Sequence, residues 1–231
     1  GGAIFVRAGA TLTITGNALF DGNGAHGGNG QAESATTLAG ASGAGAGSDL
    51  FMMKGSTVNL DPGAGNVITF NGDASGTSIA DDSFPSGVST PTATGKGADI
   101  HIKSGLVIFN GTNLYSGQTI LDGGVLQAQD GDGIYFDSNI NFKGGVLQSN
   151  GDFTRYVGTL SNRVQWTGDG GFAAHDGDLN VKLSNNQTML WASNSFVPNG
   201  NALLFGSETA TNKVNFQNNI TDISWMNEVL A

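Results

Sequence analysis

Short apolar runs follow one another along the chain, separated by equally short polar turns. Several runs alternate apolar with polar residues, as in Leu179-Val181-Leu183. Alternation with a period of two is typical of a half-buried β-strand. The pattern predicts strands at 3–6, 11–15, 17–20, 49–53, 56–60, 66–70, 99–103, 106–109, 118–121, 124–128, 133–136, 139–142, 145–148, 163–166, 178–183, 188–192, 202–205 and 213–216.

The last dozen residues differ from everything before them. Ile220, Ile223, Met226 or Trp225, and Val229-Leu230 recur near helical spacing, whereas no upstream stretch sustains that period. We therefore separate a C-terminal tail, 220–231, from the strands. Three interpretations remain open: a helix that caps the preceding strands, a helix that docks on a neighbour, or the frayed end of a chain cut within a repeat.

Two segments interrupt the strands. Residues 22–49 are almost wholly Gly, Ala, Ser, Thr and Asn, and residues 73–98 hold Pro85 and Pro91. Neither segment has a periodic apolar pattern. We expect both to protrude as Gly/Ser/Ala-rich insertions that can be shortened without unfolding the rest.

Repetition gives the strongest signal about the fold. The pentapeptide GGVLQ at 123–127 returns at 144–148, 21 residues later. VITFNGD and LVIFNGT place Phe70 and Phe109 39 residues apart, about two such units. A period near 20 with short strands and tight turns predicts an all-β fold over residues 1–219, a right-handed parallel β-helix in which each coil buries its side chains against its neighbours. The rival is a β-sandwich or propeller, which should show more Asn-Gly hairpins and a longer period.

The composition of the chain narrows the classes of function that are possible. With 19 acidic against 9 scattered basic residues the net charge is −10, which disfavours nucleic-acid binding. The chain has no Cys, which excludes thiolate catalysis, Cys-ligated zinc and disulfides. No apolar run approaches the roughly 20 residues of a membrane span, so we expect no direct membrane insertion.

One stretch resembles a known family. GTNLYSGQTILDGGVLQA, residues 111–128, is similar to the passenger-associated repeat of bacterial autotransporters, the type V secreted proteins. That repeat reads Gly-Thr-Asn-x-Tyr-Ser/Thr-Gly-x-Thr and continues into Gly-Gly-x-Leu-Gln. Residues 151–216 also resemble the family. GGAI (1–4) and FDGN (20–23) are similar to the paired tetrapeptides of polymorphic membrane proteins, so the resemblance covers most of residues 1–216.

The resemblance implies a parallel β-helix passenger on the surface of a Gram-negative bacterium, or secreted from it. A C-terminal β-barrel translocator, absent from this chain, would carry it across the outer membrane. The family fixes no single activity. We expect a non-catalytic adhesin or self-association module whose partners are host or bacterial surface molecules or other copies of itself. The alternatives are a structural subunit that polymerises into an extracellular filament or matrix, and a glycan-active β-helix enzyme.

The sequence contains partial cofactor and metal motifs, but the residues around them do not complete a site. Gly22, Gly24 and Gly27 match G-x-G-x-x-G, but a Gly/Ala tract follows where a dinucleotide site needs a helix. DGDGIYFD (130–137) begins like a calcium loop and then lacks the ligands and glycine that an EF-hand requires. We therefore predict no cofactor and no metal site.

Candidate catalytic groups are few. His26 lies in the first insertion, His101 alternates out of Ile100-Ile102 toward solvent, and His175 beside Asp176 is the best candidate for proton transfer, although a turn explains it better. The carboxylates that a glycosidase would need occur in Gly-rich turns, where Asp is common for local reasons: Asp81, Asp82, Asp130, Asp132, Asp137, Asp169, Asp176 and Asp178. Of the three tryptophans, which are the candidates for stacking on sugars, Trp166 is predicted to pack in the core, whereas Trp191 and Trp225 stay open. No catalytic residue is predicted.

Overall fold

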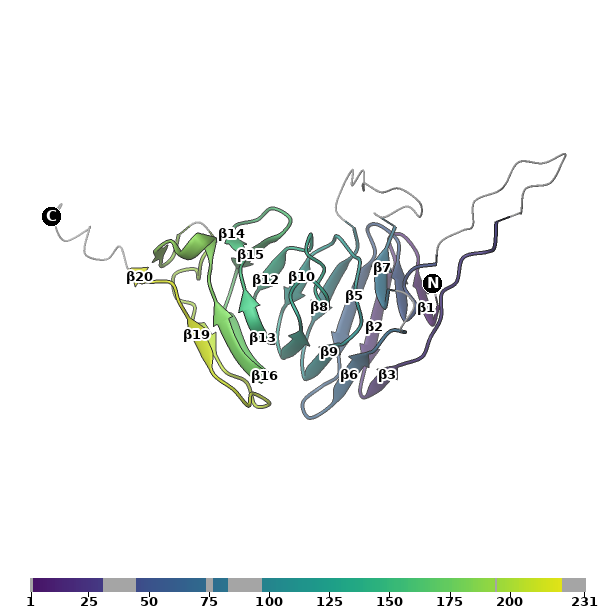
Figure 1. Ribbon diagram of the computed structural model, residues 1–231, viewed down its shortest axis with the longest axis horizontal. Coiled ribbons are helices and arrows are strands. Elements are labelled where there is room, and N and C mark those ends of the chain that lie inside the picture. Colours follow the sequence, from purple (N-terminus) through teal and green to yellow (C-terminus); the bar gives the residue numbers. More distant parts are fainter. Residues whose placement is uncertain (1, 31–44, 74–76, 83–96, 194, 222–231) are drawn as a thin grey trace.

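The structure is a computed structural model that describes residues 2–30, 45–73, 77–82, 97–193 and 195–221 (Figure 1). These residues form an all-β protein whose only helix is the three-residue 3₁₀ turn η1 (Ser184–Asn186). None of them lies in a helix long and apolar enough to cross a membrane. The strands are β1 (Ile4–Val6), β2 (Thr11–Thr15), β3 (Ala18–Phe20), β4 (Leu50–Met52), β5 (Thr57–Asp61), β6 (Val67–Phe70), β7 (Ile79–Asp81), β8 (Asp99–Ile102), β9 (Leu106–Phe109), β10 (Thr119–Leu121), β11 (Val125–Ala128), β12 (Ile140–Phe142), β13 (Val146–Phe153), β14 (Tyr156–Val157), β15 (Arg163–Trp166), β16 (Gly170–Val181), β17 (Met189–Leu190), β18 (Leu203–Phe205), β19 (Val214–Phe216) and β20 (Ile220–Thr221).

Almost all strands belong to three parallel sheets. The three-stranded sheet has the order β1-β4-β7, and the seven-stranded sheet the order β14-β15-β12-β10-β8-β5-β2. The eight-stranded sheet has the order β18-β16-β13-β11-β9-β6-β3, with β19 also paired to β16. β17 and β20 form a separate pair. Every pairing between these strands is parallel.

The chain visits the sheets in a fixed sequence. From β1 to β9 it runs three times through the three-, seven- and eight-stranded sheets in turn, and β10 to β13 add two visits to the two larger sheets. One complete round through these sheets is called a pass. Parallel neighbours require a long connection, and here the rest of the pass supplies it. In Figure 1 the passes lie side by side in chain order.

The two GGVLQ segments occupy equivalent places in adjacent passes. Val125 pairs with Val146 and Leu126 with Leu147 in the parallel ladder between β11 and β13. Both leucines are fully buried. The pentapeptides that repeat in the sequence are therefore ladder neighbours in the fold.

The glycines of the repeat lie where successive turns touch. A Cβ on Gly144 would lie 2.3 Å from the carbonyl oxygen of Asp122, and one on Gly145 would lie 2.7 Å from that of Gly123. Real side chains do not approach backbone atoms so closely. The turn of one pass can rest on the turn before it because these positions carry no side chain.

The expected number of repeat units between Phe70 and Phe109 is wrong. Their 39-residue separation suggested about two repeat units, but β6 and β9 are direct neighbours and the two residues pair. Their rings meet edge to face with centroids 5.7 Å apart. The pass between them is longer because it includes β7 and residues outside the described range.

A single apolar core fills the space between the sheets. Two inward rows of the seven-stranded sheet run in register, one from Leu12 through Val58 and Ile100, the other from Ile14 through Leu60 and Ile102. At the C-terminal end aromatic rings take over. Phe142 stacks on Trp166 with centroids 4.8 Å apart. Trp166 is 2% exposed, which confirms its predicted place in the core.

The motif GTNLYSGQT serves the fold. Asn113 accepts the backbone N–H of Ile79 at 2.8 Å and donates to the carbonyl of Gly133 at 2.7 Å, so it joins three passes. The fully buried Tyr115 hydroxyl lies 2.8 Å from Thr119 Oγ1, whose own neighbour is Ser138 Oγ at 2.9 Å. Burial raises the pKa of Tyr115, which keeps the hydroxyl neutral. The buried polar residues of the motif therefore all have hydrogen-bond partners inside the fold.

The first insertion ends earlier than the sequence suggested. Within 22–49, Ser48 and Asp49 are buried. Asp49 accepts hydrogen bonds from Asn23 Nδ2 at 2.8 Å, from Gly72 N at 2.7 Å and from Ser78 Oγ at 2.7 Å. This carboxylate anchors the end of the segment on the next pass. Residues 31–44, on which the expected protrusion depends, lie outside the described residues.

The second insertion also contains packed structure. Strand β7 lies within 73–98, with Ile79 fully buried and paired to Leu50. Ala98 is fully buried as well. The range 73–98 was too wide because one apolar pair, Ile79-Ala80, is enough for a short internal strand. Residues 83–96 lie outside the described residues.

Three further expectations need correction. GIYF (133–136) is a turn in which only Ile134 makes an isolated bridge, because the Gly-Asp-Gly residues before it bend the chain. The tail was expected to leave the strand pattern at 220, but the β-branched Ile220 and Thr221 pair with Met189 and Leu190. Strand β16 extends back to Gly170, through residues whose sequence, GGFAAHDG, gave no alternating strand signal. The remainder of the tail, with Trp225, lies outside the described residues.

Candidate binding face on the eight-stranded sheet

The outward side of the eight-stranded sheet carries in-register rows of side chains. Val67, Leu106, Val125 and Val146 pair in succession across β6, β9, β11 and β13 and form what is called the apolar row. Two positions further along each strand, Gln127 pairs with Gln148. Alternation along each strand sends these residues outward, while Ile68, Val107, Leu126 and Leu147 point into the core.

Residues 206–212, called the crossing segment, fold back over this face. β18 pairs with the start of β16 and β19 with its end, so the residues between them leave the ladder. Ser207 Oγ donates to Gln148 Oε1 at 2.6 Å and Thr209 Oγ1 donates to the same oxygen at 2.9 Å. His175 Nδ1 lies 2.9 Å from the carbonyl oxygen of Thr209 and donates to it. These bonds fix the segment across the outward faces of β13 and β16.

An apolar groove lies on one side of the crossing segment. It has a volume of ≈ 420 Å³. The apolar row forms its floor, the turns at Ala64–Asn66, Gly105 and Gly124 form one wall, and Ser207, Glu208 and Thr209 form the other. Ligand pockets are typically about 300–1,000 Å³, mostly apolar and supplied with a few polar groups. This groove meets that description.

A smaller polar pocket of ≈ 150 Å³ lies on the other side of the crossing segment. Its lining comes from the ends of β9, β11 and β13 and from the bend in β16. The polar residues that line it are Asn110, Gln127, Gln129, Asp132, Gln148, Ser149, Asn150, His175 and Asp176.

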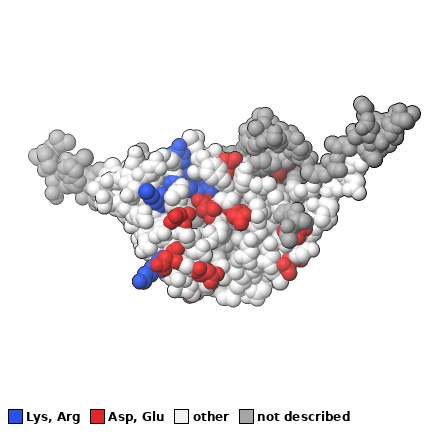
Figure 2. Space-filling model, viewed as in Figure 1, with Lys and Arg blue, Asp and Glu red and all other residues white. Residues whose placement is uncertain are grey.

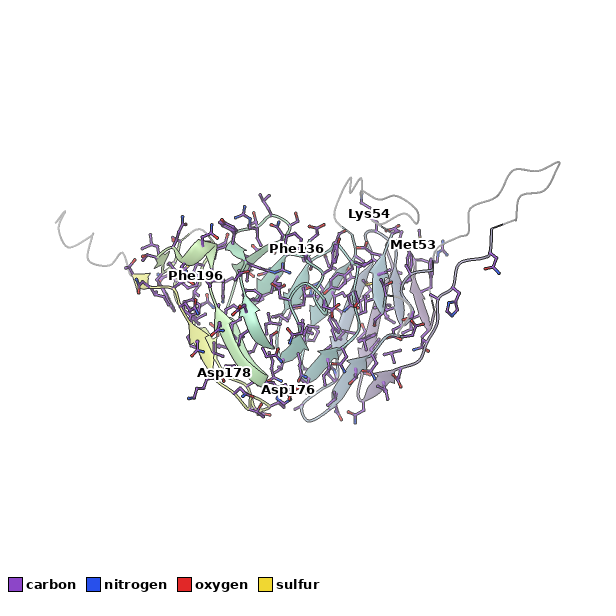
Figure 3. The ribbon with its side chains drawn as sticks, in the orientation of Figure 1. Met53, Lys54, Phe136, Asp176, Asp178 and Phe196 are labelled. Atoms are coloured by element: carbon purple, nitrogen blue, oxygen red, sulfur yellow. The ribbon has the colours of Figure 1, made fainter. Side chains whose placement is uncertain are left out.

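The bend in β16 exists because four residues have no partner in β13. Ser149 pairs with Ala174, but Gly151 pairs with Leu179, so residues 175–178 bulge outward. Asp176 has φ 59°, a left-handed conformation that Asp tolerates better than most residues. Figure 3 places Asp176 and Asp178 together at the lower end of β16. His175 and Asp176 thus reach the pocket, with His175 Nε2 3.4 Å from Asp176 Oδ1.

Charge around the two cavities is acidic. Glu208 lines the groove, Asp132 and Asp176 line the pocket, and no Lys or Arg in the described part of the chain lines either one. In the view of Figure 2 the basic side chains lie on the left half of the molecule, beside acidic ones. Anionic ligands are therefore disfavoured at both cavities.

Most of the other candidate carboxylates hold turns in place. Asp81 accepts the N–H of Ser116 at 2.7 Å, and Asp82 accepts that of Lys54 at 2.6 Å. Asp169 accepts the N–H of Ala202 at 2.8 Å, and this backbone hydrogen bond lowers the pKa of the carboxyl. Asp178 accepts the N–H of Lys213 at 3.1 Å. Asp137, in the turn after Tyr135, is not among the residues that line either cavity.

Asp130, the first residue of the calcium-like motif, is paired with an arginine. Arg155, 3% exposed, donates from Nε and Nη2 to Asp130 Oδ1 at 2.8 and 2.6 Å. It also donates to the carbonyl oxygens of Ser138 and Tyr135. The guanidinium therefore already occupies Asp130 Oδ1. Among the described residues, no three His, Asp or Glu side chains gather as a metal site.

His101 does point outward, yet it does not simply face solvent. Its Nδ1 lies 2.6 Å from Asp122 Oδ2, and Lys103 Nζ lies 2.7 Å from the same oxygen. Lys143 Nζ lies 3.2 Å from Asp122 Oδ1. Burial alone raises the pKa of Asp122, but hydrogen bonds from Lys103, His101 and Lys143 outweigh it and hold the pKa at about 2. This cluster lies on the seven-stranded sheet, away from both cavities.

The structure therefore brings together three of the weighed residues, Asp132, His175 and Asp176, and disperses the others. His26 lies in the described start of the first insertion, 22–30, and Trp191 packs half-buried against Phe196 with ring centroids 6.1 Å apart.

A scan against protein-family models, a search of curated proteins and a search of solved structures each found no match for this chain. The described geometry therefore provides the evidence on function.

Sequence reasoning missed the groove, although a signal for it exists. Val67-Ile68, Leu106-Val107 and Val125-Leu126 are apolar at consecutive positions, so the strands are apolar on both faces. Such continuous runs indicate a second covered or binding face.

Proposed function

We propose that the chain is a stretch of right-handed parallel β-helix from an autotransporter passenger, exposed at the surface of a Gram-negative bacterium or secreted from it. It acts there without catalysis, as an adhesin or self-association module. Recognition takes place on the outward face of the eight-stranded sheet. Its partners are host or bacterial surface molecules or other copies of the chain.

Two features support the β-helix. Successive passes pair only in parallel, and each sheet gains its strands in chain order up to β13. A right-handed course follows from the general handedness of crossovers between parallel strands of one sheet. The resemblance of residues 111–128 to the passenger-associated repeat supports the secretion class.

The apolar groove is the observation that carries the binding function. Soluble proteins seldom leave a contiguous apolar surface open unless it serves a contact. Here four aliphatic side chains stand in one row, and a hydrogen-bonded segment walls them on one side. A preformed groove lowers the ordering cost of binding.

The ion pair and the hydrogen bonds that the carboxylates make support the non-catalytic assignment. Asp130 is neutralised by Arg155, and Asp81, Asp169 and Asp178 accept backbone N–H groups of turns. These bonds give each carboxylate a place in the fold. General acid–base catalysis would instead require such groups to converge on one substrate atom.

A charge placed in the groove tests the proposal. Val125→Lys introduces an ammonium at the centre of the apolar row, and Thr13→Lys introduces the same group on the outward side of β2 as a control. We would measure the fluorescence of the neutral apolar dye Nile red, the solution mass by sedimentation equilibrium, and retention of the protein on bacterial and epithelial cells.

We expect Val125→Lys to reduce dye binding and either self-association or cell retention, while Thr13→Lys leaves them unchanged. If wild type and Val125→Lys behave alike in all three assays and both are folded, the groove is not the recognition surface and the proposal fails.

A further inference from the structure

The polar pocket beside the crossing segment has its own ligand chemistry. Protein hydrogen bonds engage part of each amide that lines the pocket. The hydrogen-bonding groups that remain can therefore be assigned one by one.

One chain of amides is fixed by a backbone carbonyl. The carbonyl oxygen of His175 can only accept, so Asn150 Nδ2 donates to it, at 3.2 Å. Asn150 Oδ1 then faces Gln129 and accepts from its Nε2 at 2.5 Å. Gln129 Oε1 takes no part in these bonds and is presented as an acceptor.

A second chain runs from the crossing segment. Gln148 Oε1 accepts the hydroxyls of Ser207 and Thr209, and its Nε2 donates to Gln127 Oε1 at 2.9 Å. The Nε2 group of Gln127 is left as a donor. Asn110 Nδ2 donates to Asn71 Oδ1 at 2.9 Å, which leaves Asn110 Oδ1 as an acceptor.

The carboxylates add acceptors to this set. Asp132 Oδ1 accepts the hydroxyl of Thr112 at 2.6 Å, which orients the carboxylate and leaves Oδ2 outside that bond. Asp176 lies across the pocket on the bend of β16. The pocket thus presents amide donors, amide acceptors and carboxylate acceptors within one small volume.

That mixture selects the class of ligand. An anion would be repelled by Asp132 and Asp176, and among the described residues of the lining no Lys or Arg opposes them. A metal ion would be served by oxygens alone, whereas Gln127 Nε2 directs N–H groups into the same space. A hydroxyl group both donates and accepts, so several hydroxyls on one neutral molecule can satisfy all of these groups.

We propose that this pocket is a subsite for one unit of a neutral sugar, with the rest of a glycan extending along the outward face. The inference rests on the proposed recognition function and names the ligand class at one part of the same face. The volume of ≈ 150 Å³ far exceeds the roughly 10–15 Å³ that one water needs. A ligand of several heavy atoms therefore fits, and the open mouth allows a longer chain.

Two binding assays test the proposal. The wild-type chain is presented with neutral monosaccharides and oligosaccharides in saturation-transfer NMR, and with an array of neutral glycans. Gln129→Ala removes the amide bonded to Asn150, and Asp132→Asn removes charge with little change of shape. Asn59→Ala, an outward amide on β5 of the seven-stranded sheet, is the matched control. All three variants change partly or fully exposed side chains, and far-UV circular dichroism with thermal melts would confirm their folding.

We expect at least one neutral glycan to bind the wild type, at least tenfold weaker binding by Gln129→Ala, and unchanged binding by Asn59→Ala. Asp132→Asn should retain measurable binding because a neutral ligand needs no charge. Binding that Asp132→Asn abolishes, together with binding of simple alkylammonium ions to the wild type, would assign the pocket to a cation and overturn the proposal. Absence of binding by every neutral glycan would overturn it as well.

The outcome is separable from that of the proposed function. Should Val125→Lys alter self-association or cell retention while no sugar binds, the recognition function stands and the sugar subsite fails. Should sugar bind in the pocket while Val125→Lys has no effect, the subsite stands and the groove fails.

Discussion

Close contacts between turns make single glycines decisive for stability. Gly144 rests on the carbonyl of Asp122 in the preceding pass, where a Cβ would come within 2.3 Å. The obstructing atom belongs to the backbone and cannot rotate away. Relief would require the two passes to separate locally, with loss of ladder hydrogen bonds.

We expect Gly144→Ala to lower the free energy of unfolding by about 1–3 kcal/mol, the usual cost of overpacking. Gly28→Ala is the matched control, since a Cβ there meets nothing within 4 Å. Urea denaturation followed by circular dichroism measures both. Equal stability of the two variants would contradict the close packing of the turns.

The cluster around Asp122 predicts a dependence of stability on pH. The pKa of the Asp122 carboxyl is about 2 in the folded protein, compared with about 3.9 in an unfolded chain. Because the folded pKa is lowered, the contribution of Asp122 is fully present above about pH 4 and is lost as the pH falls through about 2. Asp122→Asn lacks this contribution at every pH.

The stability difference between wild type and Asp122→Asn should therefore shrink as the pH falls from about 4 to about 2. Chemical denaturation at a series of pH values measures it. Asp152→Asn, a change at another outward carboxylate, serves as the control. A difference that stays constant over this range would show that Lys103, His101 and Lys143 do not stabilise the carboxylate.

At the level of secondary-structure elements, one arginine joins the turn before β12 to the connection between β13 and β14. Arg155 bonds Asp130 and the carbonyls of Tyr135 and Ser138 while itself only 3% exposed. No strand pairing holds this turn together, apart from the isolated bridge between Asp130 and Ile134. The arginine replaces a ladder with side-chain hydrogen bonds.

We expect Arg155→Met to cost about 3–5 kcal/mol, since it removes the guanidinium from Asp130 and from the carbonyl of the buried Ser138. Arg155→Lys should restore little because an ammonium cannot reach the same set of acceptors. Lys182→Met removes an exposed charge as the control and should stay within about 0.5 kcal/mol of wild type. An Arg155→Met protein as stable as that control would refute the role given to the arginine.

For the whole molecule, the net charge of −10 opposes contact between two copies. If the apolar groove mediates self-association, screening should favour it, because salt weakens the repulsion and leaves apolar contact intact. The mean solution mass at fixed protein concentration should rise between about 10 mM and 0.15 M salt, where the Debye length falls from about 30 to 8 Å. Sedimentation equilibrium measures it, and Val125→Lys should not show the increase. A mass that falls with salt would point to an ionic interface instead.

The strand pattern and the 21-residue recurrence were sufficient to predict an all-β, parallel, repeating chain. Period-two alternation and turn residues are local properties, and stacking of GGVLQ on GGVLQ follows from equal sequence at one-pass spacing, so the ladder of β11 and β13 was predictable. The lengths of the other passes were not. A short apolar pair such as Ile79-Ala80 becomes a strand only because Leu50 and Phe51 offer it a ladder.

The candidate site depended on tertiary structure in a similar way. His175 and Asp176 stood out as neighbours in sequence, but Asn110, Gln129 and Asp132 join them only once three passes are in register. The apolar row likewise combines residues from four strands far apart in the chain. Sequence determined which residues alternate along each strand. Parallel pairing decided which of them stand side by side, because each ladder register is set by contacts between distant segments, and those contacts created both the groove and the pocket.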